Sequence, residues 1–492
     1  MSKYILVIDQ GTTSSRVIIY DRRGNSIFKA QKELAQIYPK PGYVEFDADI
    51  IYEDVVKLMH QALKEVNIDL KDIVGCGVTN QRETTVLWDK TTGKPIYNAI
   101  CWQSVQSDSI CIDLKNKGYE KVINEKTGLI INPYFSASKI KWILDNVSGA
   151  KELMDQGNLS FGTIDSWLIY RLTGKHVTDY TNASRTLLFN IHTLSWDKEL
   201  LDIFGVSESI LPELVSSNET IGMITEERIK KYGDFEICAI AGDQQASLIG
   251  HTCLYEGDLK ITYGTGSFML LNTGSTPHKS NNGLLTTVAY KIGDTVAYAL
   301  EGSVFCAGAA FKYIRDNLEI VKSFDDENFM PTDSNGVIFV PSLTGLGAPY
   351  WSSEAKGAIL GMTRGTNKHD IAFATILGVA YLNYDVLLSM KDDTKIDVDL
   401  ISVDGGASTN SILMQAESDI TKTNISAIST SEATSLGIYY LVSLNKGIVK
   451  SFEEIKERYK RTKLYKPKDT NYSVSYDKWK KACRLVMEYD EE

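Results

Sequence analysis

The chain carries the same local pattern twice: a buried strand, a turn rich in Gly and Thr, and a second strand. It occurs first at residues 4–20 and again at residues 259–271, near the middle of the 492 residues. A chain of this length is too long for one ordinary core, so two or three domains are expected. The repeat therefore predicts two related halves, residues 1–250 and 251–492, with a boundary close to residue 250.

Helical and strand patterns alternate within the first half. Apolar residues at helical spacing predict a helix around residues 50–66, and a short buried strand follows at residues 73–78. The first strand, the turn and the second strand continue through another turn into a third strand near residue 27, which predicts an antiparallel meander. Such alternation is typical of an α/β fold. From residue 450 on, the charged and helical pattern predicts a solvated outer layer.

The composition excludes several classes of protein. The 52 basic and 63 acidic residues give a net charge of −11, which argues against nucleic acid or an anionic membrane as the main partner. No stretch approaches the roughly 18–20 apolar residues of a membrane span, and the opening apolar run is too short for a signal peptide. The seven cysteines are scattered, and the six histidines form no metal-binding pattern. We therefore expect a cytoplasmic protein whose chemistry does not rest on Cys or His.

The first Gly/Thr turn, residues 9–16, is a candidate phosphate site. It places backbone N–H groups, hydroxyl side chains and an Arg directly after a buried strand, and Asp9 at the strand end is a candidate metal ligand. The turn is no Walker loop, because GxxxxGK[ST] occurs nowhere in the chain. A plain hairpin turn favours the same residue types and explains the turn equally well. The second turn at residues 264–267 favours the phosphate interpretation, because two such turns suit a nucleotide cleft between domains.

Three further segments carry candidate side chains. Asp243 ends a strand before an expected helix, where it is a candidate general base or metal ligand, although an aspartate at a helix N-cap is the commoner case. Arg82 and Glu83 also follow a strand. They either bind the hydroxyls of a polar substrate or form a surface ion pair, which is commoner. The glycines in residues 403–410 allow a planar group or a phosphate to approach closely, and a helix N-terminal turn explains them equally well.

These residues suit phosphoryl transfer better than other reactions. That reaction needs positioning, Mg²⁺ and one carboxylate more than a strong nucleophile. The chain offers aspartates and phosphate-compatible turns, and its few histidines are dispersed.

At these segments the sequence resembles the FGGY carbohydrate kinases, most closely those that act on glycerol. Matching motifs cover nearly the whole chain in order, among them DQGTTSSR at 9–16, TNQRETT at 79–85, PYFSASKIKW at 133–142, AGDQQA at 241–246, YGTGSFML at 263–270 and VDGGAS at 403–408. The resemblance implies two actin-like (RNase H-like) α/β domains flanking an ATP cleft. It also implies MgATP-dependent phosphorylation of glycerol to sn-glycerol 3-phosphate, the entry step of glycerol catabolism, by a homo-oligomer of two or four copies.

The resemblance also implies roles for single residues. Asp243 would be the general base. The groups expected at the glycerol are Arg82, Glu83, Trp102, Tyr134, Asp243, Gln244 and Phe268. Those expected at the phosphates and the rest of the nucleotide are Thr12, Thr13, Ser14, Arg16, Thr265, Gly308, Lys312, Gly406 and Asn410. Asp9 and Asp243 would serve the Mg²⁺ ion.

Two stretches depart from the family pattern. Residues 104–106 read Ser-Val-Gln where the family carries basic residues, and Leu377, Leu382 and Tyr384 replace polar or charged residues. Lys312 also stands where Gln is frequent. Two alternatives therefore stay open: an FGGY kinase for another polyol or ketose, and a non-catalytic regulatory paralog. The intact Arg82, Glu83, Tyr134 and Phe268 argue against the first, and the intact Asp243 argues against the second.

Overall fold

The computed structural model describes residues 3–324, 333–428, 432–459 and 461–489. Its chain divides into two compact units. Unit 1 comprises Met1–Thr252, Thr286–Tyr298 and Thr434–Arg458, and unit 2 comprises Cys253–Leu285, Ala299–Ala433 and Tyr459–Glu492. Two segments from the second half of the sequence thus complete the unit formed by the first half.

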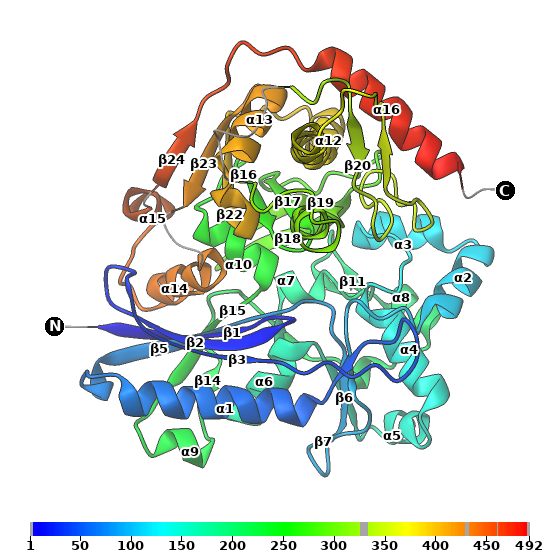
Figure 1. Cartoon of the computed structure of the whole chain (residues 1–492). Coiled ribbons are helices and arrows are strands. Elements are labelled where there is room, and N and C mark those ends of the chain that lie inside the picture. Colours follow the sequence, from blue (N-terminus) through cyan, green and yellow to red (C-terminus); the bar gives the residue numbers. More distant parts are fainter. Residues whose placement is uncertain (1–2, 325–332, 429–431, 460, 490–492) are drawn as a thin grey trace. The chain divides into compact units, whose positions relative to one another are not determined.

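A six-stranded sheet with the order β14-β15-β5-β1-β2-β3 lies at the centre of unit 1. Its strands are β1 (Tyr4–Gln10), β2 (Ser14–Tyr20), β3 (Ser26–Glu33), β5 (Ile73–Asn80), β14 (Gly222–Met223) and β15 (Glu236–Gly242). Strands β1, β2 and β3 form the predicted antiparallel meander, whereas β1, β5 and β15 run parallel. Helix α1 (Ala48–Glu65) runs alongside the meander (Figure 1) and begins where the Asp47 side chain accepts hydrogen bonds from two backbone N–H groups.

The three parallel strands end together. Gln10 of β1 pairs with Asn80 of β5, and Asn80 pairs with Gly242 of β15. The turn after β1, the loop after β5 and helix α10 (Asp243–Gly250) therefore start at the same edge of the sheet. Side chains at the carboxyl ends of parallel strands converge there, which is the usual place for a ligand site in an α/β fold.

Shorter elements surround this sheet. The strands are β4 (Glu45–Phe46), β6 (Val86–Asp89), β7 (Lys94–Pro95), β8 (Ala99–Ile100), β9 (Leu159–Gly162), β10 (Val177–Asp179), β11 (Phe189–Asn190), β12 (Ser195–Trp196) and β13 (Glu213–Val215). The helices are α2 (Asp108–Asn116), α3 (Glu120–Thr127), α4 (Ser136–Asn146), α5 (Ala150–Asp155), α6 (Ile164–Thr173), α7 (Tyr180–Ala183), α8 (Lys198–Phe204), α9 (Glu227–Lys230), α14 (Ala433–Asn445) and α15 (Phe452–Arg458).

The second large sheet has seven strands in the order β18-β19-β17-β16-β22-β23-β24. These are β16 (Leu259–Tyr263), β17 (Ser267–Asn272), β18 (Leu285–Ile292), β19 (Thr295–Val304), β22 (Leu400–Gly405), β23 (Asn424–Ile428) and β24 (Arg461–Tyr465). Of this sheet, Thr286–Ile292 of β18 and Thr295–Tyr298 of β19 are counted in unit 1. The other elements of unit 2 are β20 (Ile338–Val340), β21 (Ala358–Leu360), α11 (Gly308–Lys312), α12 (Lys368–Thr394), α13 (Ser411–Thr421) and α16 (Ser473–Glu488). Strands β16 and β17 form the predicted second strand–turn–strand pattern. The tail beyond residue 450 is not wholly helical, because β24 joins the sheet.

Helix α12 is the apolar centre of unit 2. In the described part of the chain it alone is long and apolar enough to cross a membrane, so the expectation that no stretch approaches that length was wrong. It is a core helix, with 83% of that stretch buried within the protein. Two of the unusual residues, Leu377 and Leu382, lie on α12 in the core of unit 2. The third, Tyr384, packs edge-on against Tyr476 of α16, with ring centroids 5.1 Å apart. These departures from the family pattern are therefore core contacts of α12.

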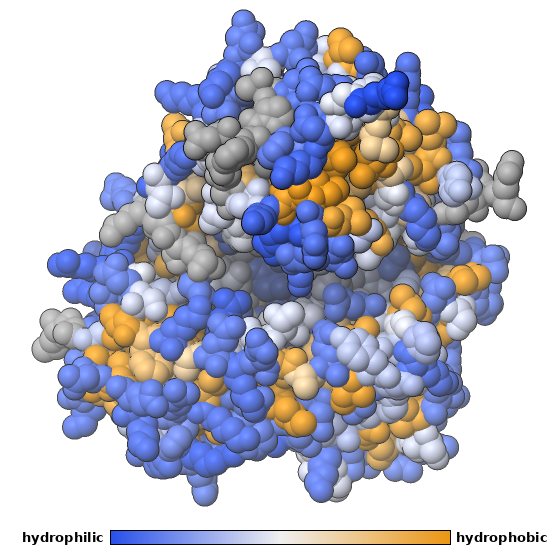
Figure 2. Space-filling view, in the orientation of Figure 1, coloured by the Kyte–Doolittle hydropathy of each residue, from blue (hydrophilic) through white to orange (hydrophobic). Residues whose placement is uncertain are grey.

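The visible surface is mainly polar (Figure 2), as the charged composition predicts. Hydrophilic side chains cover most of the face seen in Figure 2, with smaller hydrophobic areas between them. The seven cysteines are all free and all buried.

Candidate active site

The first Gly/Thr turn is a tight hairpin between β1 and β2. The Gly11 N–H donates to the Ser14 carbonyl at 2.9 Å, so the turn exposes Thr12 and Thr13 at its tip. Asp9 and Arg16 face each other across the hairpin, with Arg16 Nε 3.4 Å from Asp9 Oδ2. The structure thus brings the predicted phosphate residues of unit 1, and the predicted metal ligand Asp9, onto one hairpin.

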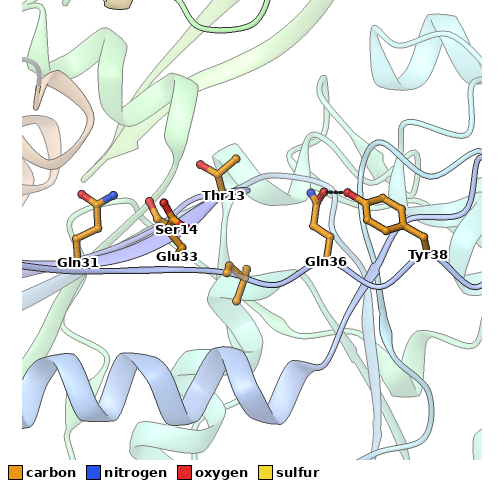
Figure 3. A pocket seen from close by; sticks show the side chains of 7 residues that line it. Thr13, Ser14, Gln31, Glu33, Gln36 and Tyr38 are labelled. Atoms are coloured by element: carbon orange, nitrogen blue, oxygen red, sulfur yellow. Dashed lines mark hydrogen bonds between the residues drawn. The ribbon is translucent and has the colours of Figure 1, made fainter.

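A pocket of about 360 Å³ opens beside this hairpin. Figure 3 shows the hydroxyls of Thr13 and Ser14 on one wall, with Gln36 and Tyr38, hydrogen-bonded to each other, on another. The remaining wall comes from Gln31, Glu33 and Leu34. The pocket is polar and lies directly against the candidate phosphate turn.

The loop after β5 and the start of α10 form a compact cluster around Arg82. Its guanidinium lies 3.4 Å from Asp243 Oδ1, donates to Gln245 Oε1 at 3.2 Å and donates to the Tyr134 hydroxyl at 3.4 Å. The Arg82 side chain is 2% exposed, whereas that of Asp243 is 29% exposed. Asp243 is therefore accessible to a ligand, whereas Arg82 contacts Asp243 from the buried side. The Gln244 N–H also donates to Asp243 Oδ1, at 2.7 Å.

Glu83 is buried and paired. The Arg185 guanidinium donates from Nε to Glu83 Oε1 at 2.6 Å, and both side chains are at most 1% exposed. The Glu83 backbone adopts φ +59°, a left-handed conformation that is costly for a residue with a side chain. Hydrogen bonds from the hydroxyls of Thr85 and Ser136 to the Glu83 carbonyl hold it there. Burial rules out the surface ion pair for Arg82 and Glu83.

A buried lysine fixes the segment that carries Tyr134. The Lys139 ammonium donates to three successive carbonyls, those of Pro133, Tyr134 and Phe135, at 2.5, 2.6 and 3.1 Å. Complete burial lowers the pKa of Lys139 to about 8. All three ammonium donors are used within the loop, so Lys139 orients Tyr134 rather than a ligand.

A buried polar network holds two strand ends in place. Asn80 and Asn182 exchange amide hydrogen bonds at 2.9 and 3.1 Å. Asp179 accepts from the hydroxyl of Thr181, which in turn accepts from the Gly242 N–H at 2.9 Å, one residue before Asp243. Burial raises the pKa of Asp179. The network therefore fixes the backbone on both sides of the Arg82–Asp243 contact.

Trp102 contacts both the hairpin between β1 and β2 and the cluster around Arg82. Its ring lies edge-on to Tyr134, with centroids 5.4 Å apart, and its indole N–H donates to the Thr12 hydroxyl at 2.9 Å. Of the unusual residues 104–106 that follow, Ser104 and Gln106 share a hydrogen bond, while the buried Gln106 Nε2 has no partner among the described residues. The Ser104 hydroxyl accepts from the Val44 N–H and donates to Gln106 Oε1 at 2.9 Å. Neutral hydrogen bonds thus replace the basic residues of the family at this place.

In unit 2 the candidate nucleotide residues lie on turns where backbones almost touch. A Cβ on Gly266 would lie 2.1 Å from the Val304 carbonyl oxygen, and one on Gly308 would lie 2.4 Å from that of Gly264. Gly405 has φ +90°, and a Cβ there would lie 2.1 Å from the Tyr263 carbonyl oxygen. Only glycine fits these positions. The Thr265 carbonyl accepts hydrogen bonds from two N–H groups at the start of α11.

The other predicted residues of unit 2 are placed as follows. Gly406 is exposed on the short helical turn after β22, and Asn410 caps α13 by accepting from the Leu413 N–H at 2.7 Å. Lys312 is exposed at the end of α11. Phe268 is half-buried on β17, and so belongs to unit 2, whereas the other predicted glycerol residues belong to unit 1.

Sequence reasoning missed several residues that support the cluster: Arg185, Lys139, Asn80, Asn182 and Asp179. Asp179, Asn182 and Arg185 lie in residues 177–197, a further stretch that resembles the FGGY kinases and to which no role was given. Asn80 directly follows the apolar strand pattern at residues 73–78 and so carried a local signal, whereas Arg185 stands among polar residues that do not mark it as buried.

The chain matches known proteins over its full length. Residues 4–250 match the N-terminal domain, and residues 259–444 the C-terminal domain, of the FGGY family of carbohydrate kinases. A glycerol kinase of Lactobacillus acidophilus is 49% identical over 491 residues, covering 98% of both chains. The structure of a Plasmodium falciparum glycerol kinase with ADP superposes with a TM-score of 0.93 at 36% identity, covering 98% of both chains. A ligand-bound xylulose kinase from Lactobacillus acidophilus gives 0.88 at 25% identity, covering 99% of this chain and 97% of that one.

Proposed function

This chain belongs to the FGGY family of carbohydrate kinases, and on that premise we propose that it transfers the terminal phosphoryl group of ATP to glycerol. Its similarity to glycerol kinases over the full length supports the substrate. The observation that carries the proposal is the contact of the buried Arg82 with Asp243 and Tyr134, whose side chains are both partly exposed. A triol needs a partner for each hydroxyl, and a site built this way rejects analogues that leave a buried group unpaired.

Asp243 is the proposed general base. Its carboxylate takes the proton from the attacking primary hydroxyl, which makes that oxygen a better nucleophile toward phosphorus. Arg82 and the Gln244 N–H hold Oδ1, so the carboxylate keeps one orientation as the proton moves. Glu83, Tyr134 and Gln244 bind the remaining hydroxyls, while Trp102 and Phe268 cover the carbon chain.

The hairpin of unit 1 binds the phosphates in this proposal. Thr12, Thr13 and Ser14 supply hydroxyl donors, and Arg16 supplies a positive charge. In the described residues no three His, Cys, Asp or Glu side chains gather to hold a metal ion. This fits Mg²⁺, which is held by one or two carboxylates and completes its shell with phosphates and water. Asp9 and Asp243 are the carboxylates proposed for it, and the ion would neutralise charge on the phosphates.

Unit 2 provides the rest of the nucleotide site in this proposal. Thr265 and Gly308 lie around the start of α11, and Gly406 and Asn410 lie between β22 and α13, with Lys312 at the end of α11; the space beside Gly406 is open. The domain roles follow: residues 1–250 for polyol and phosphates, and residues 251–492 for the nucleotide.

The cellular setting is proposed on fewer observations. Seven free cysteines suit a reducing compartment, which supports a cytoplasmic enzyme. Glycerol phosphorylation there would be the entry step of glycerol catabolism. We propose a dimer or tetramer on the resemblance alone, and light scattering of the purified protein tests it.

Coupled ADP release from MgATP tests the function directly. The panel is glycerol, dihydroxyacetone, erythritol, xylulose and gluconate, with a control that lacks any acceptor. A strong preference for glycerol is expected. A preference for xylulose or another acceptor would replace the proposed substrate, and a folded protein that binds ATP but phosphorylates none of them would be a non-catalytic paralog.

A further inference from the structure

The hydrogen bond between Trp102 and Thr12 links two segments that are 90 residues apart in sequence. Trp102 follows β8. Its backbone N–H donates to the Thr84 hydroxyl at 3.2 Å, and that hydroxyl donates to Gln81 Oε1 at 2.9 Å. Thr12 lies at the tip of the hairpin between β1 and β2. The tryptophan is therefore fixed from the loop after β5 and reaches the candidate phosphate turn with its indole nitrogen.

The donor and the acceptor in this hydrogen bond are fixed. An indole N–H is a donor and never an acceptor, whereas a threonine hydroxyl has one hydrogen and two lone pairs. Thr12 must therefore accept from Trp102, and its own hydrogen must point elsewhere. Within the described residues the Thr12 side chain makes no other hydrogen bond. Because Thr12 is partly exposed at the hairpin tip, that hydrogen is presented to a ligand.

We propose that Trp102 is a positioning residue for phosphoryl transfer, which sets the Thr12 hydroxyl as a hydrogen-bond donor to an oxygen of the nucleotide's phosphates. This rests on the proposed function and adds a second role for Trp102 beyond covering the carbon chain of the polyol. With one lone pair taken by the indole N–H, the hydroxyl hydrogen is free to point away from the ring, where it can donate to a phosphate oxygen. The same ring edge-on to Tyr134 ties this orientation to the polyol cluster.

Trp102→Phe is the most direct variant, because it replaces the indole by a smaller aromatic ring that has no N–H donor. We expect kcat/KM for MgATP to fall about tenfold to a hundredfold, the range of one hydrogen bond to a charged group. KM for glycerol should change less. Thr12→Val should cause a loss of the same kind, and Thr12→Ser, which keeps the hydroxyl, should restore most of it.

The double variant separates positioning from a structural effect. If Trp102 acts through Thr12, Trp102→Phe added to Thr12→Val costs little more, whereas independent roles give additive losses. Trp196→Phe is the matched control: it removes an indole N–H that donates to the Pro212 carbonyl at 3.0 Å, and we expect a lower Tm with unchanged kinetics.

Binding of a non-hydrolysable ATP analogue with Mg²⁺, measured by calorimetry, gives a result even if glycerol proves not to be the acceptor. Weaker binding to both Trp102→Phe and Thr12→Val supports the proposal on its own. Inactivity of the unaltered enzyme on the whole acceptor panel would overturn the proposed function without touching this result. Additive losses, or a Trp102→Phe variant that changes only KM for glycerol, would overturn the positioning role.

Discussion

The candidate site residues of unit 1 act through side chains, whereas those of unit 2 lie on turns shaped by the backbone. Around Arg82, the contacts of the guanidinium join it to other polar side chains, those of Asp243, Tyr134 and Gln245, and Glu83 pairs with Arg185 behind it. Around Thr265, the close contacts join a glycine to a carbonyl oxygen at Gly266, Gly308 and Gly405.

The difference matches two kinds of ligand. A small polyol has only its hydroxyls to be recognised by, so selecting it needs oriented donors and acceptors. A nucleotide offers a flat base and charged phosphates, which backbone N–H groups and open turns accommodate. We therefore expect single side-chain changes to alter polyol kinetics in unit 1, and an added methyl group to alter nucleotide kinetics in unit 2.

The largest effect is expected for Asp243→Asn. Losing a general base lowers turnover by about 10²- to 10⁴-fold, while an amide of the same shape leaves glycerol and ATP binding largely intact. Coupled ADP release and calorimetry measure the two separately. Asp145→Asn, which changes an exposed aspartate paired with Lys141, serves as the control. Persistent turnover in Asp243→Asn would mean that Asp243 is not the base.

Arg185→Met tests whether the side-chain cluster depends on its buried supports. Removing one partner of a buried ion pair costs about 3–5 kcal/mol, because Glu83 would keep an uncompensated charge. We expect a lower free energy of unfolding in urea and a higher KM for glycerol, with KM for MgATP less affected. Arg185→Lys, which keeps the charge, covers the case in which the Met variant does not fold.

Arg228→Met is the surface counterpart. Arg228 also pairs with glutamates, but its side chain is 44% exposed, and such pairs are worth about 1 kcal/mol or less. Equal losses in the Arg185 and Arg228 variants would remove the distinction between buried and exposed charges.

Gly266→Ala tests the backbone-shaped half. Its Cβ would lie 2.1 Å from the Val304 carbonyl oxygen, so the turn must move, at a cost of roughly 1–3 kcal/mol. KM for MgATP should rise while KM for glycerol stays nearly constant. Gly365→Ala, whose Cβ would have only an ordinary contact at 3.8 Å, is the control. A change in glycerol kinetics alone would contradict the division of roles.

Two buried carboxyls, one in each unit, should make the free energy of unfolding depend on pH. Burial raises the pKa of Asp165 and of Glu417 to about 7. Between about pH 4 and 7 the folded protein therefore keeps protons that the unfolded chain has released. The free energy of unfolding falls as pH rises through this range, by at most about 1.4 kcal/mol per pH unit for each group.

Asp165→Asn and Glu417→Gln should each flatten that slope, as measured by urea unfolding from pH 4 to 8. Burial also lowers the pKa of His176 to about 4, which acts in the opposite direction but cancels in the difference between each variant and the unaltered protein. An unchanged slope in both variants would mean that these carboxyls do not stay protonated in the folded state.

Much of the fold was predictable because its signals are local. The strand–turn–strand patterns and the amphipathic helix α1 depend on neighbouring residues, and the structure confirms them. The pairing of Arg185 with Glu83 was not predictable, because 102 residues separate them and nothing local marks either as buried. The left-handed backbone of Glu83 was not predictable either, because hydrogen bonds from other segments hold it in place. The residue roles taken from the family resemblance stay predictions that the variants above test.

The composition of unit 1 from three separate stretches has a consequence for its synthesis. The chain passes between the units five times, and unit 1 takes its last segment, Thr434–Arg458, after nearly all of unit 2. The Tyr20 hydroxyl lies at the end of β2, and its hydrogen-bond partner Ser435 is synthesised more than 400 residues later. On the ribosome unit 1 is therefore complete only when unit 2 is almost finished, and a fragment ending near residue 250 would leave the core of unit 1 partly uncovered.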